Sequence, residues 1–505
     1  MNSTRSQWFA ETETVYREVV EQLSINLNSI HSVNRSGRCW EIFIGAWLQQ
    51  FVDMVMLRVY EIENNVIIQK PSTKFAPANS LVEFQQFSKN TNFVEQLHED
   101  VVATMDSRLI EELKDQLASC ISSPKRNLKL LSHSYVSATY LPRMTEFALQ
   151  MRLFRIPRRM RSQQMMQFEL DASKRSLIAL RTKSSTRHAN LIISLAQRYM
   201  PRTYIEGFSL LGHTSKPWRG SRSPKVIFTA NRHLYDDSFN YWAAHAVENG
   251  ARLVLAQHGG NYGISEFPSF SERHEVSIAD RYITWGWKSA ENTYPGFALS
   301  VNKKPKMQSA TAKKLLVVTE QLWKHPRSLF SDIPEASQYL QHLTLTINSL
   351  NQQIKQQVLL RIHHGHQDAG TSQFLWWNKN CPEIKCDDGS MNFEQRLLES
   401  KLVLIAHNGT TIPECFAQNF PIVITWSDSY MIVRERAKEA FDALEKVGVF
   451  HRNPESAATF IGSVWDDVDG WWNSHDVISA RNQFTNQFAR STEHPVKFMV
   501  KALRF

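Results

Sequence analysis

The chain has 505 residues, of which 42% are hydrophobic and 21% are charged, and its formal net charge is +9. The length predicts two or three domains, and the composition excludes an intrinsically disordered protein. The five cysteines lack the CxxC pairs of zinc ribbons and redox motifs, which favours a reduced, cytoplasmic compartment. The first residues lack the apolar core of a signal peptide, so we do not expect export.

Residues 1–200 are predicted to be mostly helical, with weak strand candidates at 65–69 and 128–135. The most apolar stretch, 39–60, is long enough to span a bilayer, but it carries Glu41, Asp53 and Arg58. We therefore predict a buried helix there.

A basic segment, residues 143–187, contains eleven Lys or Arg and only three acidic residues. This excess favours an anionic partner, such as a lipid headgroup, a polyanionic glycan or nucleic acid. The alternative is a solvated helical face that only keeps the protein soluble. Few aromatic residues interleave the arginines, so we do not expect nucleic acid to be the partner.

From residue 225 onward, apolar strands alternate with helices, which predicts βαβ units and parallel sheets. The first series has strands at 225–230, 252–256 and 281–287, and a helix that begins at Asp236 or Asp237 and ends at Gly250. A lysine-rich stretch, 300–312, is the predicted linker. The second series has strands in KLLVVTE, VLLRIHH, EIKCDD, LVLIAHN and PIVITW, and helices at 333–356, 393–400, from 411, and at 430–447.

This pattern predicts an α/β fold with two Rossmann-like doubly wound domains and a helical N-terminal region. We expect residues 1–305 to hold the helical region and an acceptor domain, and residues 306–470 to hold a donor domain. Residues 471–505 are expected to form a C-terminal helix that packs back on the first domain.

Turns that follow strands are the informative ones, because ligands of open parallel sheets bind beyond the carboxyl ends of the strands. One such turn places His258 among glycines that let a ligand approach the backbone, and its imidazole suits a general base. Glu266 and Glu275 are alternative bases. The acceptor side of this turn is predicted to comprise Gln257, Gly259, Gly260 and Asn261. The other interpretation is a tight turn with a hydrogen-bonded histidine.

A second turn, 407–414, joins an apolar strand to a helix N-terminus, where unpaired N–H groups and the helix dipole favour a phosphate. The alternative is a capping box, in which Thr411 and Glu414 only satisfy the helix backbone.

Metal chemistry is not predicted. Asp467 and Asp469 have DxD spacing but do not follow a strand, and His363, His364 and His366 have no carboxylate at ligand spacing. The chain has no GxxxxGK[ST], GxSxG or HExxH motif, which argues against a P-loop NTPase, an α/β-hydrolase and a zincin.

Three blocks, HSVNRSGRCWEIFIGAWL (31–48), AQHGGNYGISEF with HEVSIADRYITWGW (256–287) and 434–472, resemble a family of transferases from bacterial surface-carbohydrate loci. That family is similar to two-domain glycosyltransferase B-type enzymes. The turn IAHNGTTIPECFAQNFPIVI also resembles the donor-site pattern of capsule transferases and glycerophosphotransferases.

The resemblance implies that Gly409, Thr410 and Thr411 contact the donor phosphates and that Glu414 holds a ribose or sugar hydroxyl. Asn408, in the same turn, is also expected at the donor phosphate site. Arg361 or Arg434 would be the cation at the leaving group. The sequence departs from the family pattern at LRIHHGHQDAG, which keeps Arg361 but has histidines after it.

The expected function is transfer of a sugar from a nucleotide-activated donor to a surface carbohydrate or lipid-linked acceptor, with no cofactor and no metal. The expected location is the cytoplasm, with peripheral contact to the anionic inner face of the membrane through residues 143–187. The alternatives are a glycerol- or polyol-phosphate transferase of the same architecture and a non-catalytic nucleotide- or polyanion-binding protein.

Overall fold

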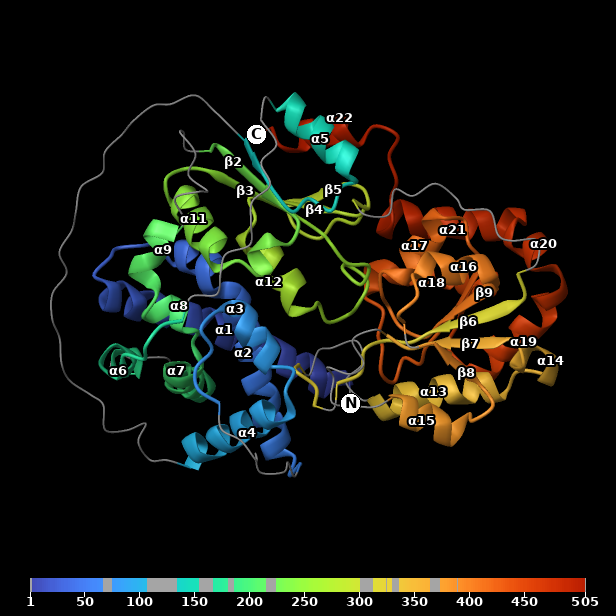
Figure 1. Cartoon of the computed structure of the whole chain (residues 1–505), viewed down its shortest axis with the longest axis horizontal. Coiled ribbons are helices and arrows are strands. Elements are labelled where there is room, and N and C mark those ends of the chain that lie inside the picture. Colours follow the sequence, from blue (N-terminus) through green and yellow to red (C-terminus); the bar gives the residue numbers. More distant parts are fainter. Residues whose placement is uncertain are drawn as a thin grey trace.

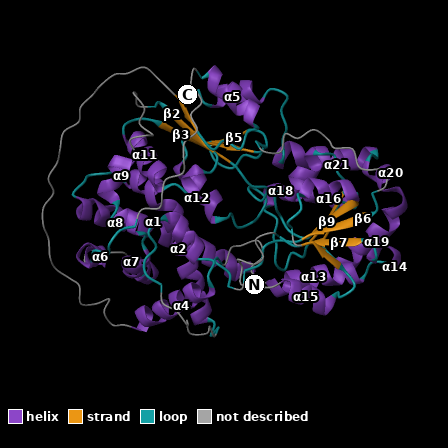
Figure 2. Ribbon diagram, viewed as in Figure 1, coloured by secondary structure: helices purple, strands orange, loops and turns teal. Residues whose placement is uncertain are grey.

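The computed structural model describes residues 2–66, 75–106, 134–153, 167–179, 186–214, 224–299, 312–323, 325–328, 336–363, 373–387 and 389–504. It contains two parallel β-sheets flanked by helices, together with a helical N-terminal region (Figures 1 and 2). This confirms the predicted α/β class with two Rossmann-like domains and a helical N-terminal region.

The N-terminal region is built around one buried helix, α2 (Gly37–Glu63). Its N-cap is Ser36, whose side chain accepts a hydrogen bond from the Cys39 N–H. Although α2 is apolar and long enough to cross a membrane, its apolar stretch is buried inside the protein, as predicted. The other helices of this region are α1 (Asn2–His31), α3 (Leu81–Phe87), α4 (Thr91–Asp106), α6 (Ala172–Ala179), α7 (Arg187–Tyr199), α8 (Arg202–Ile205) and α9 (Phe208–Thr214).

The first sheet is ordered β1-β2-β3-β4-β5, and every neighbouring pair is parallel. Its strands are β1 (Ser134–Val136), β2 (Val226–Thr229), β3 (Arg252–Ala256), β4 (Arg281–Thr284) and β5 (Thr293–Pro295). Of the two weak strand candidates, the second overlaps β1 and otherwise lies outside the described residues. In the first, Asn65 and Val66 are not in a strand, and 67–69 are outside the described residues. β5 was not predicted.

Successive residues of these strands point to opposite faces of the sheet, and both faces are buried. Ile227 belongs to the core shared with α2, α11 (Asp237–Glu248) and α12 (Phe270–Ile278). Val226 and Phe228 belong to a second core shared with α5 (Arg143–Arg152) and α22 (Pro495–Ala502).

The second sheet is ordered β11-β10-β9-β6-β7-β8, and all its pairs are parallel. Along the chain, β7 and β8 follow β6 on one side of it, and β9, β10 and β11 then follow on its other side. The direction in which strands are added therefore reverses between β6 and β9. The strands are β6 (Lys314–Val318), β7 (Val358–Arg361), β8 (Lys385–Asp387), β9 (Ser400–Ile405), β10 (Ile422–Thr425) and β11 (Phe450–His451). β11 was not predicted.

The helices of the second domain are α13 (Ala336–Asn348), α14 (Gln352–Lys355), α15 (Gln373–Asn380), α16 (Phe393–Glu399), α17 (Thr411–Ala417), α18 (Glu435–Lys446), α19 (Pro454–Val464), α20 (Val468–Trp472) and α21 (His475–Phe488). The single helix predicted at 333–356 is divided into α13 and α14. The break comes at Asn351, whose side chain accepts the Ile354 N–H and starts the new helix.

The last segment of the chain crosses from the second domain to the first. α21 packs on α17 and α18, with Phe484 against Phe416 and Phe441. At Arg490 the backbone bonds to Trp285 and Ala298 of the first domain, and α22 then covers the first sheet. The crossing therefore begins after α21 and not at residue 471, because the apolar face of α21 is already buried in the second domain.

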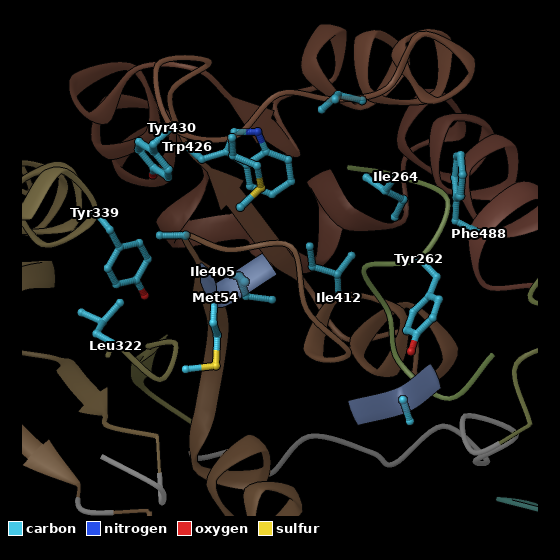
Figure 3. Packing of buried hydrophobic residues seen from close by; sticks show 14 of the residues in the cluster. Met54, Tyr262, Ile264, Leu322, Tyr339, Ile405, Ile412, Trp426, Tyr430 and Phe488 are labelled. Atoms are coloured by element: carbon cyan, nitrogen blue, oxygen red, sulfur yellow. The ribbon is translucent and has the colours of Figure 1, made fainter. Parts of the chain in front are cut away.

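The two domains also share an apolar core. Met54 of α2, Tyr262 and Ile264 of the first domain and Ile405 and Ile412 of the second belong to one buried cluster (Figure 3).

The basic segment is not a uniformly exposed face. Arg175 is buried, and its guanidinium pairs with Glu206 at 2.6 Å. Residues 154–166 and 180–185, which include six of its eleven basic residues, lie outside the described residues. The described exposed cations of the segment include Arg143 and Arg152 at the two ends of α5.

Candidate active site

A cleft of about 520 Å³ lies beyond the carboxyl ends of β6 and β9, where the strand order reverses. This is the place where open parallel sheets bind ligands. The second domain contributes Val318, Thr319, Glu320, Gln321, Leu322, Trp323, Pro326, Arg327, Ser328, Ala336, His363, His407, Asn408, Gly409, Thr410 and Thr411 to its wall. The opposite wall consists of Gln50 and Asp53 of α2, together with Asn261, Ser269 and Phe270.

The two turns singled out by sequence touch each other at this cleft. The Gly260 N–H donates to Thr410 Oγ1 at 3.1 Å, and Asn408 Nδ2 lies 3.5 Å from the Asn261 carbonyl oxygen. A Cβ atom on Gly260 would lie 2.6 Å from the Gly409 carbonyl oxygen, so only glycine fits at this contact.

The helix after the second turn is short. α17 has seven residues, and its N-cap is Thr410, whose side chain makes no capping hydrogen bond. This contradicts a capping box that begins at Thr411. Glu414 is half-buried on α17 and is not part of the cleft wall, so its contact with a donor hydroxyl stays a prediction.

Arg327 provides a cation in the cleft wall. Its guanidinium carbon lies 4.3 Å from the centroid of the Trp323 ring, an arrangement that holds the group by cation–π attraction. Among the described residues, no carboxylate lies within ion-pair distance of Arg327. Desolvation by burial lowers the pKa of this guanidinium to about 10, and no neighbouring anion of the described residues opposes that shift.

Several buried polar atoms of the cleft residues have no hydrogen-bond partner in the described part of the chain. Three of them are acceptors: Gln50 Oε1, Asp53 Oδ1 and Asn408 Oδ1. Buried acceptors without a donor are costly, so a ligand that carries hydroxyl groups would complement them. The cleft therefore combines a cation with unmatched acceptors, which suits a phosphate attached to a polyhydroxylated group.

His258 and Glu275 form a buried pair beside this cleft. His258 Nδ1 lies 3.4 Å from Glu275 Oε1, and the carboxylate is fully buried, whereas 17% of the His258 side chain remains exposed. Tyr282 donates to Glu275 Oε2 at 2.9 Å, His233 Nε2 lies 3.2 Å from Oε1, and the Tyr262 hydroxyl lies 3.3 Å from His258 Nε2. This arrangement of base and orienting carboxylate can accept a proton from a hydroxyl group.

Burial perturbs both members of the pair. Desolvation raises the pKa of Glu275 to about 7, an effect opposed by the nearby His258. Desolvation lowers the pKa of His258, also partly opposed by Glu275. His258 is therefore neutral at pH 7, in the form that accepts a proton.

Replacing Glu275 with glutamine is expected to change how stability depends on pH. In the folded protein Glu275 keeps its proton up to about pH 7, whereas its ordinary pKa is 4.5, so the wild type loses stability as the pH rises through this interval. The free energy of unfolding of Glu275→Gln minus that of the wild type should therefore rise by up to about 3 kcal/mol between pH 5 and pH 8. Urea unfolding at the two pH values measures the difference, and an equal difference at both would contradict the raised pKa.

The other residues of the first turn have different surroundings. The Gln257 side chain is buried and bonds the Trp285 N–H, Trp287 Nε1 and the Gly259 carbonyl, so it holds the turn to the segment that follows β4. Glu266 is exposed, and its backbone N–H bonds the Ile432 carbonyl of the second domain. The structure thus brings Glu275, and not Glu266, to His258.

The two arginines predicted at the donor phosphate have other partners. Arg361 pairs with Asp387 at 3.1 Å at the end of β7, and it does not line the cleft. Arg434 links the domains: it donates to the Ser265 carbonyl at 2.8 Å and pairs with Glu272 at 3.1 Å. Their roles toward a donor stay predictions.

Sequence reasoning missed Asp53, Gln50, Trp323, Glu320 and Arg327 as cleft residues. Glu320 ends the KLLVVTE segment, so its place after a strand was a usable signal. Asp53 and Gln50 carried no such signal, because they belong to a helix far from the second domain in sequence. In the described part of the chain, no three His, Cys, Asp or Glu side chains form a group suited to a metal. His364 and His366 lie outside that part.

Three solved structures are similar to this chain at low scores. Anabaena Alr3699/HepE in complex with UDP-glucose has a TM-score of 0.38 and 13% identity, over 74% of this chain and 100% of that one. Staphylococcus aureus MnaA with UDP has a TM-score of 0.36 and 13% identity, over 61% of this chain and 84% of that one. Acinetobacter baumannii MurG has a TM-score of 0.33 and 12% identity, over 59% of this chain and 79% of that one. Nothing about the ligands of this chain follows from likenesses of this size.

No curated protein matches the chain. A family does: the LIC12162 family transferase matches residues 3–503. This match covers nearly the whole sequence, and the chain therefore belongs to the LIC12162 family of transferases.

Proposed function

We propose that this transferase moves a glycosyl group from a nucleotide-activated donor to a hydroxyl group of a surface carbohydrate or a related lipid-linked acceptor. The observation that carries the proposal is the contact of the two turns. Gly260, two residues after His258, bonds Thr410 in the wall of the cleft, so the turn that carries the proposed base contacts the turn that carries the proposed phosphate site.

In the proposed reaction, His258 takes the proton of the acceptor hydroxyl as its oxygen attacks the anomeric carbon of the donor. The bond from that carbon to the nucleotide diphosphate breaks, and the diphosphate leaves with the electron pair. Glu275 stabilises the imidazolium that forms, and Arg327 offsets the charge that develops on the leaving phosphate.

Binding of a nucleotide tests the proposal. A thermal-shift panel should include UDP, CDP, GDP and ADP, their glucose conjugates and CDP-glycerol. A compound at one hundred times its dissociation constant should stabilise the fold by about 2.7 kcal/mol. Release of a nucleoside diphosphate during turnover would support sugar transfer, whereas release of a monophosphate from CDP-glycerol would assign polyol-phosphate transfer. A panel without any stabilising compound would contradict a nucleotide-activated donor.

The proposed reaction does not use a metal, because Arg327 can offset the leaving-group charge. Turnover should therefore stay within about twofold of its untreated value in excess EDTA, as expected when a side-chain cation replaces a metal. A turnover assay with and without chelator measures this. Loss of activity that Mg²⁺ or Mn²⁺ restores would overturn the metal-independent scheme.

We place this reaction in the cytoplasm, in line with the scattered cysteines, and at the inner face of the membrane.

A further inference from the structure

α5 exposes an apolar stripe to solvent. Met144 is 77% exposed, Phe147 50% and Met151 54%. Their spacing of three and four residues puts all three side chains on one face of the helix. The opposite face carries Leu149, which is buried in the core beneath the first sheet. α5 is thus held to the first sheet by Leu149, and no described residue covers its apolar stripe.

Exposed cations lie on α5 and on the helix that packs beside it. Arg143 and Arg152 lie exposed at the two ends of α5. α22 packs beside α5 (Figure 1), and its Lys497 and Lys501 are exposed. Arg504 is exposed just beyond α22.

Few acidic groups oppose these cations on the two helices. Glu146 accepts hydrogen bonds from Thr139 and Gln150, so it is held on the protein side of α5. Glu493, before α22, is exposed. The face formed by α5 and α22 therefore combines an apolar stripe with a positive border, which we call the α5–α22 face.

The chain just before α5 lies close to the His258–Glu275 pair. Tyr140, three residues before α5, is 41% exposed, and its ring centroid lies 5.9 Å from that of His258. The Tyr140 hydroxyl accepts a hydrogen bond from Asn231 Nδ2 at 3.1 Å, which fixes it beside the end of β2.

We propose that the α5–α22 face docks on the surface of an anionic lipid bilayer. The stripe enters the boundary between headgroups and acyl chains, and the cations contact the anionic headgroups. Charge complementarity favours this occupant, because each cation near an anionic surface strengthens binding by about fivefold. If the proposed function holds, docking places His258 at the bilayer, so the acceptor hydroxyl belongs to a lipid-linked glycan.

Cosedimentation with vesicles tests the docking. The full chain should bind vesicles of phosphatidylcholine with one quarter phosphatidylglycerol at least about tenfold more tightly than vesicles of phosphatidylcholine alone. Met144→Asp with Phe147→Asp should reduce that binding at least about tenfold, and Lys497→Gln with Lys501→Gln should reduce it comparably at low salt. These positions are exposed, so the melting temperature should not change.

Leu345→Asp is the matched control. Leu345 is also 50% exposed, but it lies on α13 of the second domain, and its replacement should leave vesicle binding unchanged. Equal partitioning of the wild type and the Met144/Phe147 variant would overturn the proposal. An equal loss of vesicle binding in the Leu345→Asp variant would also overturn it, as would binding of the wild type to heparin but not to vesicles.

The outcome is independent of the proposed reaction. Stabilisation by nucleotides is measured without vesicles, and the Met144/Phe147 variant should retain it. Vesicle binding without nucleotide binding would leave the docking surface standing and remove the transfer reaction. Nucleotide binding without vesicle binding would leave the transfer reaction standing and remove the docking surface.

Discussion

His258→Ala is expected to lower turnover by roughly two to four powers of ten, the usual contribution of a positioned general base. Donor binding should stay nearly unchanged, because His258 is not part of the cleft wall. The variant should also flatten the dependence of rate on pH. In the wild type, protonation of Glu275, with its pKa raised to about 7, removes the charge that stabilises the imidazolium, so the rate should fall as the pH drops below about 7.

Tyr262→Phe is the control for this experiment. It removes the hydroxyl that lies 3.3 Å from His258 Nε2 but leaves the base and its carboxylate in place. We expect a loss of no more than about tenfold, consistent with one neutral hydrogen bond. If His258→Ala instead retains turnover within tenfold of the wild type, His258 is not the base.

Arg327→Gln is expected to weaken binding of the nucleotide found in the thermal-shift panel by about 10- to 100-fold, the worth of a hydrogen bond to a charged group. Fold stability should not fall. The wild-type protein bears the cost of a cation whose pKa burial has lowered to about 10, and glutamine removes that cost. Calorimetric titration and a thermal melt of the same sample give both quantities.

Arg361→Gln tests whether the cation at the donor phosphate is Arg327, as the cleft suggests, or Arg361, which the sequence analysis named. Arg361 pairs with Asp387, which Arg396 also contacts at 2.8 Å, so the variant keeps Asp387 paired. We expect its nucleotide affinity to equal that of the wild type. A larger loss in Arg361→Gln than in Arg327→Gln would return the phosphate contact to Arg361.

The sequence predicted the elements whose signals are local. Buried strands such as 225–230 and 402–406 are continuous apolar runs, and the glycine-rich turns that follow them could be placed at the sheet edge from topology alone. The same rule placed the turns containing His258 and Gly409 beyond the carboxyl ends of their strands, and the structure adds that the two turns touch through the Gly260–Thr410 bond.

The residues that sequence missed depend on long-range packing. Asp53 reaches the cleft because Arg273, 220 positions away, holds its carboxylate, and Ser328 donates to it at 3.2 Å. The partners of Arg361 and Arg434 could not be read from the sequence either. Arg361 ends β7 and Arg434 precedes α18, but a carboxylate from another element pairs with each of them. Helix ends were set by single side chains such as Asn351, whose cap divides one predicted helix into two.

The crossing of α22 to the first sheet affects the order in which the protein can be completed during synthesis. Arg281 of β4 donates to the carbonyl of Ala502, 221 residues later, and Met499 and Leu503 close the apolar face that Phe228 and Ile283 present. The first domain therefore cannot bury that face until the second has been translated and the last helix has left the ribosome. Closing so long a loop is slow, and during that time the open sheet face is a surface that a chaperone can hold.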